Sequence, residues 1–225
     1  MDIEVWSDVA CPWCLIGKKR LERALRARPR LPVTLRYRSY ELDPHQRPLP
    51  PGDGLVAVLA RKYGIPEQRA RAMMDHVAAQ AAAEGVEMDF EAQRREAGSF
   101  DAHRLLQLAH SIDPALQADL KEGLMRARFC EGRSIREPAS LKRLALAAGL
   151  PADAVDRVLD TPDAFARNVR EDEAMARAMG VTGVPFFVFD RKLALSGAQP
   201  VEVFHRALDR IAPESAGSAC AVETT

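Results

Sequence analysis

Strand-like sequence lies only at the two ends of this 225-residue chain. Near the N-terminus, DIEVW and VTLRYRSY alternate apolar and polar residues as strands do, and they flank a helical run from Pro12 through Ala27. From Leu55 to about Gly180 the period is helical almost throughout, with breaks at glycines and prolines. The strand pattern then returns in VPFFVFD and RKLALSGA, and PVEVFHRALDRI predicts a closing amphipathic helix.

The order of these segments predicts one sheet domain that is interrupted by a block of helices. The opening strand–helix–strand unit implies two parallel strands joined by a right-handed crossover, and the later hairpin implies antiparallel pairing. We therefore expect an α/β (α+β) fold with a mixed sheet. Residues 1–54 and 181–211 form the sheet domain, with part of the preceding helix, 162–180. Residues 55–180 form the helical insertion, and residues 212–225 a disordered tail.

Charge and hydropathy exclude several kinds of partner. Lys and Arg together number 32, as do Asp and Glu, so the chain offers no general attraction for nucleic acid or an anionic membrane. No uncharged apolar run is long enough to span a bilayer, and the first residues, MDIEVWSDV, lack the features of a signal peptide. We expect no nucleic-acid or membrane partner and a cytoplasmic location, where disulfides are usually transient and catalytic.

Cys11 and Cys14 form a CPWC motif, for which zinc binding, a structural disulfide and thiol–disulfide exchange are the alternatives. Zinc commonly takes two close pairs of ligands, and this chain has only one such pair, since Cys130 and Cys220 are solitary and the five histidines supply no second pair. We therefore expect no metal. A permanent disulfide is disfavoured by the cytosolic context, so the motif favours redox exchange.

The position of the motif supports that interpretation. Cys11 falls where the first strand ends and a helix begins, and Pro12 suits the first helical position. Unpaired N–H groups and the helix dipole stabilise an anion there and lower a cysteine pKa below its free value of about 8.5. The sequence predicts that Cys11 is an exposed nucleophile. Cys14 is predicted to resolve the mixed disulfide from one turn further along.

Several stretches resemble the DsbA family of thioredoxin-fold oxidoreductases, and within it the FrnE-like subgroup of cytosolic bacterial proteins. They are CPWC after the first strand, VP before the third, the helical block between them, YELDP, FDAHRLLQLA and LSGAQP. The resemblance runs from about Asp2 to Ile211 and implies a thioredoxin-like mixed sheet with a large all-helical insertion. One departure is Ser99, where such proteins often carry Asn.

The resemblance also assigns roles to residues. It implies that Cys11 attacks and Cys14 resolves, that Pro185 is a cis-proline facing the site, and that the backbone of Val184 pairs with the bound substrate. Beside the nucleophile, Pro12 and Trp13 are predicted to form part of the substrate-binding surface.

The function expected from these features is that of a thiol–disulfide oxidoreductase or isomerase acting on protein or small-molecule disulfides. No tightly bound cofactor is expected, and glutathione or another thiol is the candidate electron partner. One alternative is a glutathione-dependent isomerase or transferase of a small aromatic compound, although such relatives usually carry Ser in place of the first cysteine. Another is a non-catalytic redox-sensing binding module.

Three further residues are interpreted structurally. His103 lies on an amphipathic helix and is expected to be buried and hydrogen-bonded rather than a proton-transfer group. Cys130 ends an apolar helix face and is expected to be a core thiol. Cys220, in the predicted tail, is interpreted as an incidental thiol.

Overall fold

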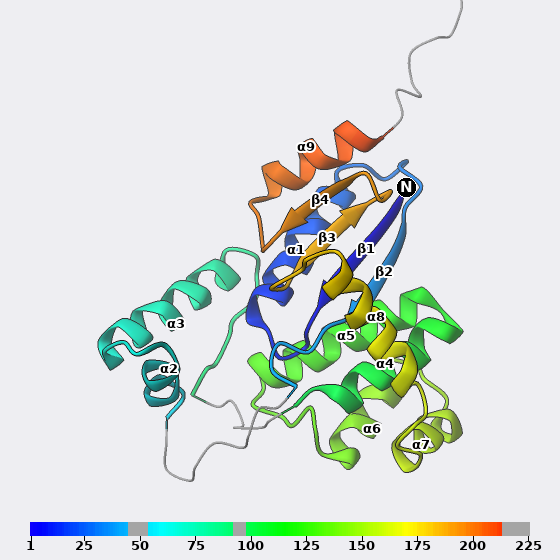
Figure 1. The fold of residues 1–225 in the computed structure, drawn as a ribbon, viewed down its shortest axis with the longest axis horizontal. Helices are drawn as coiled ribbons and strands as arrows, with labels where there is room; N and C mark the ends of the chain where they lie inside the picture. Colours follow the sequence, from blue (N-terminus) through cyan, green and yellow to red (C-terminus); the bar gives the residue numbers. More distant parts are fainter. Residues whose placement is uncertain (45–53, 92–97, 213–225) are drawn as a thin grey trace, which may run out of the picture.

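The computed structural model describes residues 1–44, 54–91 and 98–212 (Figure 1). Four strands lie at the two ends of the described sequence, and helices occupy the middle. The elements are β1 (Asp2–Ser7), α1 (Pro12–Arg26), β2 (Thr34–Ser39), α2 (Leu55–Tyr63), α3 (Glu67–Ala82), α4 (Phe100–Ile112), α5 (Pro114–Phe129), α6 (Pro138–Ala147), α7 (Ala152–Asp160), α8 (Ala166–Ala178), β3 (Phe186–Phe189), β4 (Leu193–Ser196) and α9 (Val201–Ile211).

The strands form one mixed sheet in the order β2-β1-β3-β4. β1 and β2 are parallel, with Asp2 opposite Thr34, whereas β3 runs antiparallel to β1 with Phe189 opposite Ile3. β4 returns antiparallel beside β3. This topology confirms the thioredoxin-like mixed sheet with helices inserted between β2 and β3.

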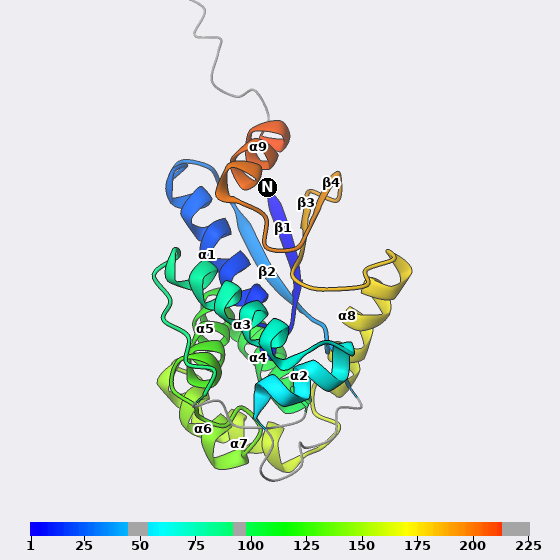
Figure 2. The same cartoon turned by 90° about the vertical axis from the view of Figure 1, so that its left-hand side faces the viewer.

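Helices cover both faces of the sheet (Figure 2). On one face α1 and α9 bury a core in which Phe187 of β3 meets Phe204 of α9 edge-on, with ring centroids 4.9 Å apart. On the other face α8 packs Ala176 against Trp6 and Val188. The alternation of side chains along β1 follows from the two-residue period of a strand. Both faces of the sheet are therefore covered by helices.

The inserted helices build a second core that reaches the start of α1. Leu105, Leu124 and Leu141, from three different helices, are fully buried in the same cluster as Cys14 and Leu15. The N-terminus of α5 is capped by Asp113, whose carboxylate accepts a hydrogen bond from the N–H of Ala115 at 2.8 Å. The dithiol thus lies where the sheet and the helical block meet.

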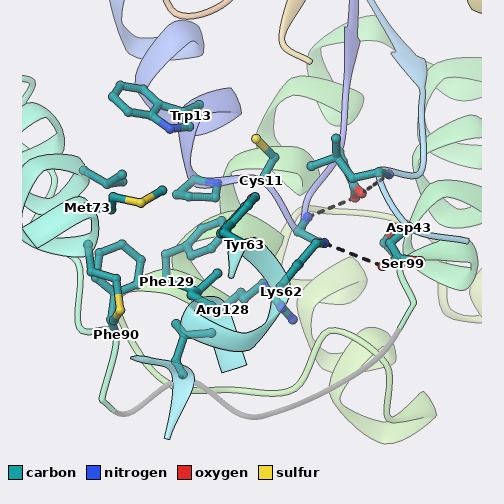
Figure 3. Close-up of a pocket in the computed structure, with 18 of the residues that line it drawn as sticks. Cys11, Trp13, Asp43, Lys62, Tyr63, Met73, Phe90, Ser99, Arg128 and Phe129 are labelled. Atoms are coloured by element: carbon teal, nitrogen blue, oxygen red, sulfur yellow. Dashed lines mark hydrogen bonds and ion pairs between the residues drawn. The ribbon is translucent and has the colours of Figure 1, made fainter. Parts of the chain in front are cut away.

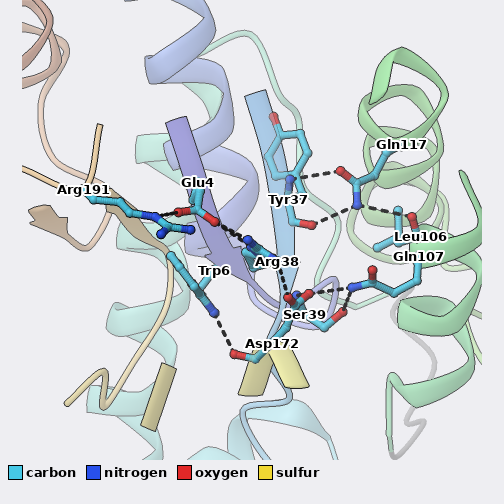
Figure 4. A network of polar contacts seen from close by, with 10 residues as sticks. All are labelled: Glu4, Trp6, Tyr37, Arg38, Ser39, Leu106, Gln107, Gln117, Asp172 and Arg191. Atoms are coloured by element: carbon cyan, nitrogen blue, oxygen red, sulfur yellow. Dashed lines mark hydrogen bonds and ion pairs between the residues drawn. The ribbon is translucent and has the colours of Figure 1, made fainter. Parts of the chain in front are cut away.

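A buried carboxylate on α8 ties the sheet to the helical block (Figure 4). Asp172 accepts hydrogen bonds from Arg38 at 2.8 Å, the N–H of Ser39 at 2.9 Å and the amide of Gln107 at 2.6 Å. Its backbone carbonyl accepts from the indole of Trp6 at 2.9 Å. One side chain therefore joins β2, α4 and α8.

Two element boundaries differ from those expected. The helix expected from Pro162 begins only at Ala166, because Phe165 has a left-handed backbone with φ of 59°. The strand expected from Arg191 begins at Leu193, because Asp190 and Arg191 have φ of 46° and 54° and form the hairpin turn.

The proposed division into a sheet domain and an insertion stays a prediction. The tail expected over 212–225, including Cys220, lies outside the described residues from 213 onward. Within the described ranges, no helix is both long and apolar enough to cross a membrane.

Candidate active site

Cys11 opens α1 directly after the loop that leaves β1. It is the N-cap residue, with an extended backbone (φ −106°, ψ 115°), and Pro12 occupies the first helical turn. The N–H of Cys11 donates to the Asp8 carbonyl at 3.2 Å, and the N–H of Cys14 donates to the Cys11 carbonyl at 3.1 Å. This local turn fixes Cys11 at the helix N-terminus, where the sequence places it.

The expectation that Cys11 is exposed is wrong, because only 5% of the residue is accessible. The segment before β3 folds over it, and its thiol lies 3.6 Å from the carbonyl oxygen of Val184. Cys11 nevertheless forms part of the wall of a pocket (Figure 3). Among the described residues, this pocket is therefore a route by which a substrate can reach Cys11.

Cys14 lies one turn further into α1 and is 2% exposed. Both cysteines are free thiols. Burial raises the pKa of Cys14 well above the ordinary thiol value, and a hydrogen bond with Cys11 and the charge of Cys11 raise it further, while Lys121 acts in the opposite direction. The surroundings of Cys14 thus favour its neutral form.

Pro185 follows Val184, the residue whose carbonyl lies beside the Cys11 thiol. The Val184–Pro185 peptide bond is cis, as the family resemblance implies. α1 approaches Pro185 closely because it carries Gly17: a Cβ atom placed there would lie 2.9 Å from Pro185 Cγ and 3.1 Å from Phe187 Cζ. The absence of a side chain at position 17 sets the spacing between α1 and β3.

The pocket beside Cys11 has a volume of about 300 Å³ and lies between the start of α1 and helices α2 and α3 (Figure 3). Trp13 is half-buried at its edge, with its ring 5.8 Å from the ring of His76. The apolar wall includes Leu42, Leu55, Leu59, Met73, Met74, Val77, Phe90 and Phe129. Asp43, Lys62, Ser99 and Arg128 add polar groups. The departure at Ser99 therefore falls on the pocket wall.

A buried acid–imidazole pair lies next to the dithiol, and its acid, Asp8, lines the same pocket as Cys11. His103 is 1% exposed, and its Nε2 lies 3.4 Å from an Asp8 carboxylate oxygen, which confirms that this histidine is buried and hydrogen-bonded. Burial alone would raise the pKa of Asp8. The hydrogen bond and charge of His103, with N–H donors from Ala10 and Leu42, instead lower it to about 2.

Two buried groups near the dithiol, Asp8 and Lys121, were not expected from the sequence. Asp8 stands three residues before Cys11, and an acid so close to a reactive thiol was an available signal. Lys121 lies on α5, remote in sequence, and is 1% exposed. Only the packing of α5 against α1 brings it near Cys14.

Cys130 lies outside the pocket beside Cys11. Cys130 is half-buried against the core of the helical block, and burial raises its pKa, which fits the expected core thiol. Across the described ranges, no group of three or more His, Cys, Asp or Glu could hold a metal ion.

With the sheet and the dithiol in place, the molecule falls in the thioredoxin-like class of proteins. The model of the DSBA-like thioredoxin domain family matches residues 2–209, and the chain belongs to that family. A search of curated proteins found no match.

Solved structures of related proteins agree with this assignment. A probable DsbA oxidoreductase from Streptomyces coelicolor is 42% identical, with a TM-score of 0.84 over 94% of this chain and 89% of that one. The cytosolic disulfide reductase DsbM from Pseudomonas aeruginosa, also solved with GSH, is 20% identical, with a TM-score of 0.62 over 93% and 98% of the two chains. A 2-hydroxychromene-2-carboxylate isomerase is 16% identical, with a TM-score of 0.62 over 93% and 95%. The last two share the fold.

Proposed function

We propose that the protein is a thiol–disulfide oxidoreductase or isomerase that acts through Cys11 and Cys14. The observation that carries this proposal is the position of Cys11, which begins α1 and lines the pocket, with the free thiol of Cys14 one turn behind it. Membership of the DSBA-like thioredoxin domain family supports the same reaction class.

In the proposed reaction the thiolate of Cys11 attacks one sulfur of a substrate disulfide. A Cys11–substrate disulfide forms, the substrate S–S bond breaks, and the first substrate sulfur leaves as a thiolate that takes a proton. Cys14 then attacks Cys11 Sγ, and the second substrate sulfur leaves. Two electrons pass from the dithiol to the substrate, and the reverse sequence oxidises a substrate dithiol.

The wall around Cys11 is suited to holding such a partner. The carbonyl oxygen of Val184, two residues before β3, lies 3.6 Å from the attacking sulfur. The backbone at this position can form hydrogen bonds with an extended peptide or with the backbone of a peptide-like thiol. Pro185 follows Val184 directly and packs against α1 at Gly17, and Pro12 and Trp13 form part of the pocket. We assign these four residues to substrate binding.

A second candidate is a glutathione-dependent isomerase or transferase of a small aromatic compound. The observation that favours it is the pocket, whose volume of about 300 Å³ and apolar wall suit a small molecule. In that reaction Cys11 holds or activates the thiol, and Cys14 is dispensable.

We further propose glutathione or another thiol as the electron partner, with a cytoplasmic location. The description of DsbM as a cytosolic reductase, and its structure with GSH, support both points by analogy of fold. Assignment to the FrnE-like subgroup rests on the sequence motifs CPWC, YELDP and LSGAQP.

Glutathione-dependent reduction of insulin tests the reaction. Cys11→Ser should lower the rate by roughly a hundredfold or more, because it removes the nucleophile. Cys14→Ser should lose turnover and accumulate one glutathione adduct on Cys11, which intact-mass spectrometry detects. Cys130→Ser is the matched control, since its thiol packs against the helical core, and it should keep the wild-type rate.

Two results would redirect the assignment. Full activity in Cys11→Ser would overturn the oxidoreductase proposal. Retention of glutathione-dependent isomerisation of a small aromatic substrate by Cys14→Ser, without insulin reduction by the wild type, would support the second candidate in its place.

A further inference from the structure

A second pocket lies at the end of the sheet where β1 begins, beside the N-terminus (Figure 1). Its volume is about 530 Å³, and it shares no residue with the pocket beside Cys11. Its walls come from the first residues of β1, alternate residues of β2, the end of α4 and the turn that joins β3 to β4. The dithiol follows the opposite end of β1. The two pockets are therefore separate sites.

The strands place charged side chains on the wall of this pocket. Side chains two residues apart in a strand lie on one face, so Glu4 shares the face of Trp6, and Arg36 is paired in register with Glu4. α8 packs Ala176 against Trp6. Nearer the start of β1, the same face carries charged side chains that line the pocket. This part of the face is therefore a polar hollow rather than an apolar core.

Several charged groups of the pocket already have partners (Figure 4). Glu4 pairs with Arg38 and, at 3.5 Å, with Arg191. A carboxylate oxygen of Asp190 accepts a hydrogen bond from the N–H of Asp2 at 2.6 Å. These contacts hold the walls of the pocket in place.

Arg36 and Lys192 also line the pocket, and neither has a carboxylate partner among the described residues. They reach the pocket from β2 and from the β3–β4 turn, with β1 between them. The Nε atom of Arg36 is inaccessible to solvent and has no hydrogen-bond partner within the described ranges, and the same holds for Nδ1 of His110. Polar groups in this condition are costly and call for an explanation.

The surroundings of the pocket disfavour further positive charge. Burial lowers the pKa of His110, and the charges of Arg36 and Arg38 lower it further, while Asp172 acts in the opposite direction. Burial also lowers the pKa of Arg36, and Arg38 contributes in the same direction, against Asp172 and Glu4. Because both pKa values shift away from the charged form, an anion bound beside these groups would be stabilised.

A phosphate group matches the two cations in charge and in shape. Its oxygens can accept hydrogen bonds from the planar fork of an arginine and from a lysine ammonium, and its double charge balances both. A single carboxylate carries only half that charge. The volume leaves room for a small body beyond the phosphate, and the Thr34 hydroxyl and the Asp2 carboxylate can bond to hydroxyl groups there. Among the described residues, no Phe, Tyr or Trp lines the pocket, so it offers a nucleobase no such ring for stacking.

We propose that this pocket binds a small hydroxyl-bearing phosphate ester, with its phosphate group held by Arg36 and Lys192. The hydroxyl groups of the ester face Thr34 and Asp2. Since the pocket shares no residue with the site beside Cys11, this binding does not depend on the proposed thiol–disulfide reaction.

Calorimetric titration of the full chain with glycerol 3-phosphate tests the proposal. Succinate carries the same double charge on two carboxylates, and glycerol carries the hydroxyl groups without the phosphate. We expect glycerol 3-phosphate to bind at a single site, at least about tenfold more tightly than succinate, and glycerol to give no binding. Equal binding of succinate, or no binding of glycerol 3-phosphate at about 10 mM, would overturn the proposal.

Substitutions in the pocket locate the bound ester. Arg36→Gln should weaken binding at least about tenfold and Lys192→Met at least about threefold, because each removes a charged donor to the phosphate. Lys192 is exposed in the hairpin turn, so its loss leaves the core unchanged, and circular dichroism checks the folding of both variants. Arg206→Gln replaces an exposed arginine of α9 outside the pocket and should keep the wild-type affinity. Wild-type affinity in either pocket variant would contradict the proposal.

The imidazole of His110 gives a readout that a folding defect would not reproduce. A bound phosphate offsets the charges of Arg36 and Arg38, so His110 should titrate at a pH at least about 0.5 higher when the ester is bound. NMR titration of the imidazole C–H signals measures this, and His110→Gln identifies the signal. His205, which contacts Arg28 outside the pocket, is the internal control and should not shift. An unchanged His110 titration at saturating ester would also overturn the proposal.

Discussion

Asp8 and Cys14 are equally buried, each 2% exposed, yet their surroundings favour opposite charge states. Asp8 receives N–H donors from Ala10 and Leu42 and faces His103, so its anion is stabilised despite burial. Cys14 faces mainly the neighbouring thiol, and its neutral form is favoured. The two pKa values shift in opposite directions because Asp8 accepts hydrogen bonds from several donors and Cys14 does not, although the two side chains are equally buried.

Asp8→Asn should therefore destabilise the fold in a pH-dependent way. The pKa of Asp8 is lowered from 3.8 to about 2, which corresponds to about 2 kcal/mol of stability at pH 7. Because the folded-state pKa lies below the unfolded one, this contribution is complete above about pH 4 and is lost as the pH falls towards 2. Urea unfolding at pH 7, 5, 4 and 3 measures it.

Asp153→Asn, on the exposed surface of α7, is the matched control and should leave the urea midpoint unchanged at neutral pH. A deficit in Asp8→Asn that stays constant from pH 7 to pH 3 would contradict the assignment of the charge to Asp8.

Individual residues were predictable from sequence where the signal is local. The strand-to-helix junction and the two-residue spacing were enough to propose Cys11 and Cys14, and Pro185 followed from a short motif. The burial of Cys11 and the position of Lys121 depend on segments that are distant in sequence, so no local pattern reports them. The predicted redox roles of the dithiol remain to be tested.

At the scale of elements, the close packing of α1 against Pro185 and Phe187 sets the geometry of the site. Gly17→Ala would place a methyl group 2.9 Å from Pro185 and 3.1 Å from Phe187. We expect a loss of about 1 kcal/mol of stability, since overpacking outweighs the gain in helix propensity, and a slower insulin reduction because the wall opposite Cys11 shifts. Urea unfolding and the insulin assay measure the two effects.

Gly123→Ala provides a control with the same chemical change. Gly123 lies inside α5, and nothing would lie within 4 Å of its new Cβ atom. This variant should gain up to about 1 kcal/mol of stability and keep its activity. Equal stabilisation by both substitutions would show that α1 has room at position 17.

Most elements were predictable because hydrophobic period and proline punctuation are properties of short stretches. The helix expected over Pro12–Ala27 occurs as Pro12–Arg26, and both late strands are present. The two displaced boundaries have a common cause. Phe165, Asp190 and Arg191 adopt positive φ values, which hydrophobic period does not report.

On the scale of the whole molecule, the hydrogen bonds of Asp172 connect three separate segments, β2, α4 and α8. Asp172→Asn would replace one acceptor oxygen by a donor among the donors Arg38, Ser39 and Gln107. We expect a loss of about 3 kcal/mol in the free energy of unfolding at pH 7, because a buried guanidinium loses part of its partner set. Urea denaturation followed by circular dichroism measures it.

Glu171→Gln is the control on the same helix. Its side chain is 57% exposed and pairs with Arg167 on the surface, so its removal should change stability by less than about 0.5 kcal/mol. An Asp172→Asn protein as stable as this control would contradict the stabilising role of the Asp172 hydrogen bonds. The helical period predicts α8 but not this contact, because the partners of Asp172 lie up to 134 residues away in sequence.

The two walls of the site, the start of α1 and the segment before β3, come from opposite ends of the chain and are therefore synthesised at different times. About 170 residues separate Cys14 from the start of β3. At ribosomal rates of about 5–20 residues per second, roughly 10 to 30 s pass between the synthesis of Cys14 and the synthesis of β3. During that interval the nascent dithiol has no Val184 carbonyl above it, and its thiols are open to any oxidant or thiol nearby.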